Sequence, residues 1–111
     1  MKFGEAIQQI CSLPAEFHKG RKSAHELVHD TGIDPEMLST ESVSAVLKSK
    51  PALVSDWLQW SEDKRSSPSY YFSSEGNSYV VGHYPGNDRV EFADPIAACA
   101  DFIVKEVKTI W

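Results

Sequence analysis

The sequence predicts an α+β fold with a helical N-terminal half, a three-stranded antiparallel meander and a C-terminal helix packed on the sheet. Apolar residues recur at helical spacing to about residue 63, the pattern becomes strand-like over residues 70–93, and helical spacing returns over about residues 94–110. The 111 residues are the length of one domain and contain no evident linker or repeat, so residues 1–111 are predicted to form a single domain.

The first two helices are predicted from apolar spacing and from residues that start and stop helices. Apolar residues fall at helical spacing over residues 3–11, and Pro14 is expected to end this helix. Over residues 22–32, Ser23 is a candidate N-cap and Gly32 a candidate stop.

The next helices are predicted in the same way. Asp34 and Pro35 are expected to start a short helical turn. Thr40 is the candidate cap of a helix over residues 41–50, and Pro51 is expected to open a longer helix that contains three large apolar positions and two tryptophans.

Residues 70–93 are predicted to form strands joined by tight turns. The predicted strands and turns are, in chain order, residues 70–73, 75–77, 78–84, 85–88 and 89–93. The turn lengths put Phe72 opposite Val81 and Val81 opposite Phe92. A last helix follows, with Asp94 as its cap and the buried positions Ile96, Cys99, Ala100, Ile103 and Val107.

This register predicts which side chains share a face of the sheet. The core face, expected to lie under the helices, carries Tyr70, Phe72, Tyr79, Val81, His83, Val90 and Phe92. The opposite face, called the outer face below, carries Tyr71, Ser73, Val80, Gly82, Tyr84, Arg89 and Glu91. Tyr71 is expected beside Gly82, so that its ring can cover the glycine. Tyrosines with a few charges are typical of a protein interface, and the alternative is that another helix covers this face.

The composition favours a soluble protein with a protein partner. The net charge of −5 disfavours direct binding to nucleic acid and suits a basic partner, although it is also an ordinary charge for solubility. Cys11 and Cys99 lie inside apolar helical patterns, and the chain has neither a signal-peptide pattern nor a long apolar run. We therefore expect a reduced, cytoplasmic protein that does not contact the membrane.

One string suggests metal chemistry. His25, Glu26 and His29 form H-E-x-x-H, in which two histidines one helical turn apart bind zinc and the glutamate activates water. The third ligand of the metzincin branch would fall on Pro35, and the 24 residues before His25 are predicted to be helical rather than to form a cleft-building sheet. The string is therefore expected to be a chance match, and no metal or cofactor is predicted.

No other catalytic pattern is present, so the chain is not expected to be an enzyme. The sequence contains no nucleophile elbow, Walker A loop or dinucleotide fingerprint. Neither cysteine has a histidine or basic residue nearby in sequence that would favour a thiolate nucleophile.

The second half of the chain resembles a known family. The segments SDWLQWSEDKRSSPSYYFSSEGNSYVVGHY and FADPIAACADFIVKEVKTI are similar to short bacterial immunity proteins, which are encoded beside polymorphic toxins, including those of contact-dependent growth inhibition. The shared pattern is a tryptophan helix, a three-strand meander and a final helix, and it covers roughly residues 53–110. Residues 1–50 match less well.

The resemblance implies a protein that binds one cognate toxin domain in the cytoplasm and blocks its active site. Many such toxins are basic nucleases, and an inhibitor that covers a phosphate-binding site is expected to present carboxylates. The candidate partner-binding residues on or near the outer face are Tyr71, Glu75, Tyr84, Asp88 and Glu91. Alternative hypotheses are a small metal-dependent hydrolase that uses His25, Glu26 and His29, and an interaction domain of another kind.

Overall fold

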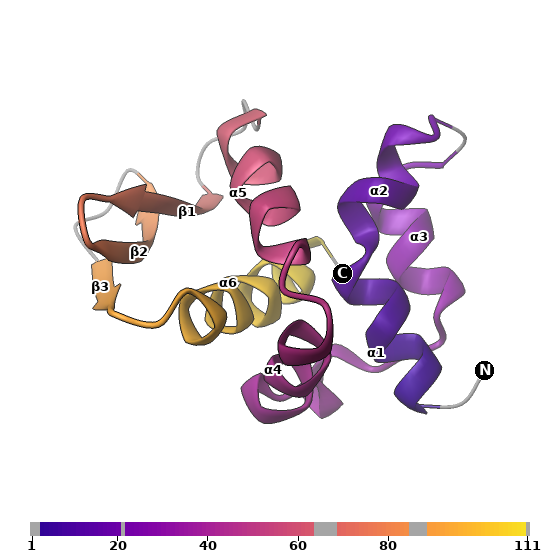
Figure 1. The fold of residues 1–111 in the computed structure, drawn as a ribbon. Coiled ribbons are helices and arrows are strands. Elements are labelled where there is room, and N and C mark those ends of the chain that lie inside the picture. Colours follow the sequence, from indigo (N-terminus) through magenta and orange to yellow (C-terminus); the bar gives the residue numbers. More distant parts are fainter. Residues whose placement is uncertain (1–2, 21, 64–68, 85–88, 111) are drawn as a thin grey trace.

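The computed structural model of the chain describes residues 3–20, 22–63, 69–84 and 89–110. Figure 1 shows helices in the first half, then a sheet, then one long helix beneath that sheet. The elements are α1 (Phe3–Cys11), α2 (Leu13–His18), α3 (Ala24–Asp30), the 3-10 helix η1 (Pro35–Met37), α4 (Thr40–Ser49), α5 (Leu53–Asp63), β1 (Ser69–Glu75), β2 (Ser78–Tyr84), β3 (Arg89–Phe92) and α6 (Pro95–Ile110). The predicted fold class is confirmed.

The helix starts follow the capping chemistry of the sequence, with two corrections. Ser23 accepts a hydrogen bond from the backbone N–H of Glu26 at 3.2 Å, as expected of an N-cap. Ser39, and not Thr40, caps α4, because its hydroxyl is the one that accepts from the N–H of Ser42. The first helix ends at Cys11 as expected, but Pro14 itself lies in the first turn of a further helix, α2, where a missing N–H costs nothing.

The strand order is β1-β2-β3, and the first hairpin has the predicted register. Phe72 pairs with Val81, and Glu75 pairs with Ser78, so the turn consists of two residues. The second pairing was predicted wrongly: Val81 lies opposite Val90 rather than Phe92. The shift is two residues, and a shift of two leaves every side chain on its predicted face. The predicted turn at 85–88 lies outside the described residues.

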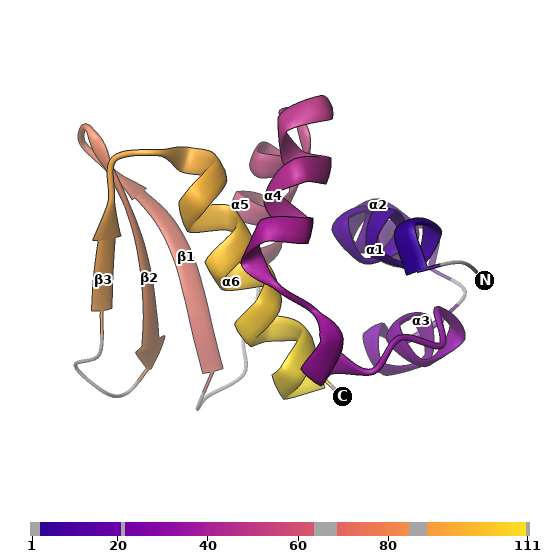
Figure 2. The same ribbon diagram turned by 90° about the horizontal axis from the view of Figure 1, so that it is seen from below.

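Helix α6 covers the core face of the sheet and packs against α4 and α5 on its other sides (Figure 2). Phe102 of α6 stacks on Phe72 of β1 with ring centroids 5.7 Å apart. Ile103 lies in the same buried cluster and is fully inaccessible to solvent. Val90, predicted to be in the core, is 48% exposed because it lies on the edge strand, away from the line of α6.

The two tryptophans of helix α5 form hydrogen bonds to the first and the last helix of the fold. The indole N–H of Trp57 donates to the backbone carbonyl of Cys11 at 2.9 Å, and that of Trp60 donates to the carboxylate of Glu106 at 2.8 Å. Burying an indole is favourable when its N–H finds a partner, and both tryptophans have one. The same helix lies along β1, where the hydroxyl of Ser61 accepts the N–H of Phe72 at 2.7 Å.

Candidate protein-binding face

The outer face of the sheet is ordered in rows that run across the strands. Tyr71 of β1 lies opposite Gly82 of β2, which lies opposite Arg89 of β3. In the next row Val80 lies between Ser73 and Glu91. Among the described residues α6 packs on the other face and α5 lies beside β1, so no described helix covers these rows (Figures 1 and 2).

The ring of Tyr71 lies over Gly82, as the sequence predicted. A Cβ atom placed on Gly82 would lie 2.4 Å from the phenol oxygen and 2.5 Å from Cζ of Tyr71. The ring therefore occupies the space that a side chain at this position would need.

Arg89 links two of the predicted partner-binding carboxylates. Its Nη2 atom lies 3.1 Å from Oε1 of Glu75 on β1 and 3.6 Å from Oε1 of Glu91 on β3. The hydrogen bond to Glu75, more than any other contact, raises the pKa of Arg89. Because these groups are about half exposed, the pairs contribute little to stability. The cluster that they form contains two carboxylates and one guanidinium.

Val80 occupies the middle strand of the outer face. Arg89 lies opposite Gly82, and its partner Glu75 lies opposite Ser78, so Val80 falls between these two rows on β2. Val80 is fully inaccessible to solvent although it lies outside the main hydrophobic cluster.

The structure brings together three of the five predicted binding residues, Tyr71, Glu75 and Glu91, around Arg89. Tyr84 lies at the end of β2 and is 61% exposed, which makes it one of the most exposed large apolar residues. Asp88 lies outside the described residues. The site prediction omitted Arg89, even though the predicted register already placed it on this face.

The histidines of the H-E-x-x-H string lie on the exposed side of α3. The rings of His25 and His29 are 4.2 Å apart between centroids. Glu26 lies in the first turn, where its N–H and its carboxylate both contact the hydroxyl of Ser23. Within the described ranges, no group of three or more histidine, cysteine or acidic side chains is placed to hold a metal ion. The role that the structure gives Glu26 is therefore helix capping.

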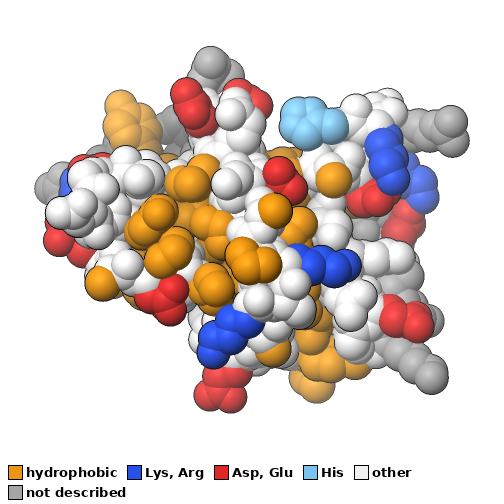
Figure 3. Space-filling view, in the orientation of Figure 1, with side chains coloured by type: hydrophobic (Ala, Val, Ile, Leu, Met, Phe, Trp, Pro, Cys, Tyr) orange, Lys and Arg blue, Asp and Glu red, His pale blue; other side chains and the backbone are white. Residues whose placement is uncertain are grey.

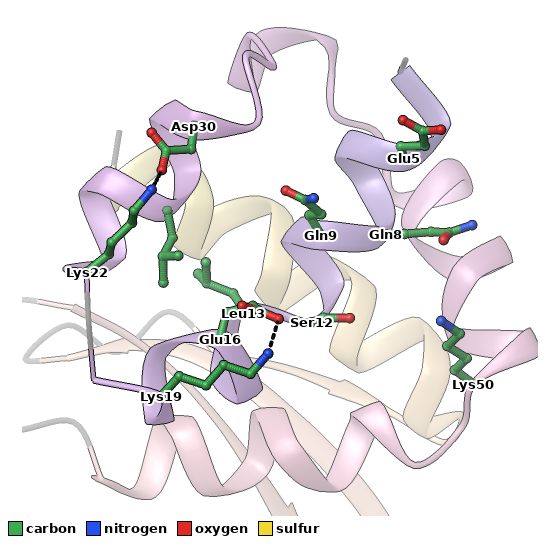
Figure 4. A pocket seen from close by; sticks show the side chains of 11 residues that line it. Glu5, Gln8, Gln9, Ser12, Leu13, Glu16, Lys19, Lys22, Asp30 and Lys50 are labelled. Carbon is green, nitrogen blue, oxygen red and sulfur yellow. Dashed lines mark hydrogen bonds and ion pairs between the residues drawn. The ribbon is translucent and has the colours of Figure 1, made fainter. Parts of the chain in front are cut away.

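A groove of about 990 Å³ lies between the α1–α2 segment and α3 (Figure 4). Ion pairs join Lys19 to Glu16 and Lys22 to Asp30 at its margin. The ionisable side chains that line it are three lysines and three carboxylates, namely Lys19, Lys22, Lys50, Glu5, Glu16 and Asp30. The formal charges of these six side chains sum to zero.

Neither cysteine thiol is suited to act as a nucleophile. Cys11 and Cys99 are both free and fully buried. Burial raises the pKa of the Cys11 thiol to about 12 and raises that of Cys99 as well. Both groups stay protonated at neutral pH, and a protonated, buried thiol is a poor nucleophile.

Charge is dispersed on the face of the molecule that Figure 3 presents. Figure 3 shows acidic and basic side chains scattered around an apolar area on the face presented there, rather than gathered into one charged patch. Within the part of the chain that the structure describes, no helix combines the length and hydrophobicity needed to cross a bilayer. Comparisons of the chain with protein-family models, curated proteins and solved structures found no match.

Proposed function

We propose that the protein is an immunity protein that binds a basic toxin domain, a nuclease, in the cytoplasm and neutralises it by covering the active site. The observation that carries the proposal is the outer face of the sheet, which no described helix covers and which presents tyrosines beside carboxylates. The resemblance of residues 53–110 to immunity proteins supports the same function.

The chemistry of this face suits a basic protein. Tyr71 and Tyr84 supply large, rigid contact surfaces that lose little conformational entropy on binding. Glu75 and Glu91 outnumber Arg89, so the local charge has the same sign as the net charge of −5. Opposite charge on a partner would speed encounter, while the buried centre of the contact would supply affinity.

A binding and inhibition experiment tests the proposal. The protein would be mixed with the toxin domain that the proposal expects to be encoded beside it, and nuclease activity would be followed as the ratio of the two proteins is varied. We expect activity to fall linearly to zero at a fixed stoichiometry, with one complex on gel filtration. Full activity in the presence of excess protein, with no complex at micromolar concentrations, would overturn the proposal.

A further inference from the structure

The position of Gly82 requires the small size of glycine and not its backbone flexibility. Among the described residues, the glycines with positive φ are Gly20, Gly32 and Gly76, and Gly82 is not one of them. An L-amino acid could therefore adopt the backbone of Gly82 without strain. What excludes a side chain there is the ring of Tyr71, which a Cβ atom would meet at 2.4 Å.

The hydroxyl end of the Tyr71 ring lies against Gly82. The distances from the Cβ position of Gly82 to three atoms of Tyr71 are 2.4 Å to the oxygen, 2.5 Å to Cζ and 2.7 Å to Cε2. These distances put the Cβ position above the plane of the ring, at its hydroxyl end. One side of this end of the ring thus contacts β2, and Arg89 lies near the phenol group.

We propose that Gly82 is a positioning residue, which lets Tyr71 lie against β2 so that the side of its ring away from Gly82 receives a lysine or arginine side chain of the partner. This inference rests on the proposed function. A ring already fixed by the sheet loses little further freedom on binding, and this lowers the cost of association.

The chemistry of the ring selects the occupant. The face of an aromatic ring carries negative charge and attracts ammonium and guanidinium groups. Two carboxylates, Glu75 and Glu91, lie in the same cluster against one guanidinium, that of Arg89. A basic side chain on the ring is thus favoured by the ring and by the local balance of charge.

A double-mutant cycle separates positioning from a general structural role. Gly82→Ala should weaken binding of the toxin domain by about tenfold or more, because the ring must leave its place. Tyr71→Ala should cost a similar factor, and the double variant should bind no more weakly than Tyr71→Ala alone. Gly4→Ala is the matched control, since a Cβ atom there meets nothing within 4 Å. Losses that multiply in the double variant would overturn the positioning role.

Substitution of the ring tests the occupant. Tyr71→Phe keeps the aromatic face and should retain binding within about threefold, whereas Tyr71→Leu should lose about tenfold. Equal binding by the Phe and Leu variants would show that no cation sits on the ring.

A measurement on the free protein keeps this inference distinct from the proposed function. A ring lying over Gly82 shifts the Hα resonances of that glycine upfield in an NMR spectrum, and Tyr71→Ala should abolish the shift. Ordinary glycine shifts in the unsubstituted protein would overturn the ring position whether or not a toxin binds. If the upfield shift is present but no toxin binds, the proposed function fails and takes the role of Tyr71 in binding with it.

Discussion

The two faces of the sheet are built from alternate residues of the same strands, yet among the described residues a helix covers only one of them. On the core face Phe72 and Val81 are closed by the apolar surface of α6. On the outer face Val80 is equally inaccessible to solvent, but it lies outside the cluster that α6 covers, beside the ion pair of Arg89 and Glu75. The core face is therefore part of the main hydrophobic core, whereas side chains on the outer face can be rearranged without exposing that core.

The difference separates stability from recognition. Burial against α6 removes large apolar areas from water, which is the dominant favourable term in folding. Ion pairs that are half exposed contribute little to stability, so Arg89 can exchange its partners at small cost. We expect substitutions on the core face to change unfolding and substitutions on the outer face to change binding.

The largest expected effect lies on the core side of this comparison. Ile103→Ala should lower the free energy of unfolding by about 2–5 kcal/mol, because it removes buried methyl groups and leaves a cavity. Ile103 is fully buried in the cluster that also contains Phe72 and Val81. Chemical denaturation would measure the change, with the neighbouring, partly exposed Val104→Ala as a control expected to lose less. An unchanged denaturation midpoint would contradict the central position of α6.

The next effect lies on the outer side. Tyr84→Ala should leave the denaturation midpoint nearly unchanged, because the side chain is 61% exposed in the free protein. It should speed dissociation of the toxin domain and cost about 2 kcal/mol of binding free energy if the residue is a central anchor. Met37→Ala, which truncates a residue 64% exposed on η1, is the matched control. Unaltered dissociation kinetics would place the anchor elsewhere.

A smaller effect is expected from charge. Glu75→Lys should slow association with a basic toxin domain, because it replaces a carboxylate by a second cation beside Arg89. The defect should shrink as salt concentration rises, because exposed charges are screened over about 8 Å at physiological ionic strength. Glu41→Lys on α4 makes the same change in net charge away from the sheet. If both variants slow association equally, the outer face is not the binding surface.

The smallest effect is expected on α3, away from both faces of the sheet. Alanine at both His25 and His29 should leave toxin inhibition intact, since the two rings lie on the exposed side of α3. The purified protein should contain no stoichiometric zinc by elemental analysis. About one zinc per chain would contradict this expectation, as would loss of inhibition in a variant that stays folded.

The sequence predicts the elements of this fold better than their connections. Side-chain alternation identified both faces of the sheet, yet it could not distinguish registers that differ by two residues, and the pairing of Val81 was wrong for that reason. Pro14 was taken as a stop because proline ends helices, but it also suits their first turn. Ser39 and Thr40 are both acceptable caps, and spacing does not choose between them.

The candidate site was predictable as a face but not as a network. Tyr71 over Gly82 followed from the first hairpin, whose turn is short enough to fix its register. The link from Arg89 to Glu75 spans three strands, and it depends on the second register, which was misplaced. A sequence pattern also gives no sign that Glu106, a charged residue, is buried beside Trp60.

The indole hydrogen bonds of α5 have a consequence for the order of folding. Each joins residues 46 positions apart, one reaching back to α1 and the other forward to α6. During synthesis, a chain that has not yet delivered α6 holds the core faces of α4, α5 and the sheet without their common cover. Such a nascent chain exposes hydrophobic surface of the kind that chaperones bind. Contacts between residues far apart in the sequence also form slowly. Until residue 106 leaves the ribosome, Trp60 cannot form its hydrogen bond to the carboxylate of α6. Tryptophan fluorescence could therefore report when the core forms.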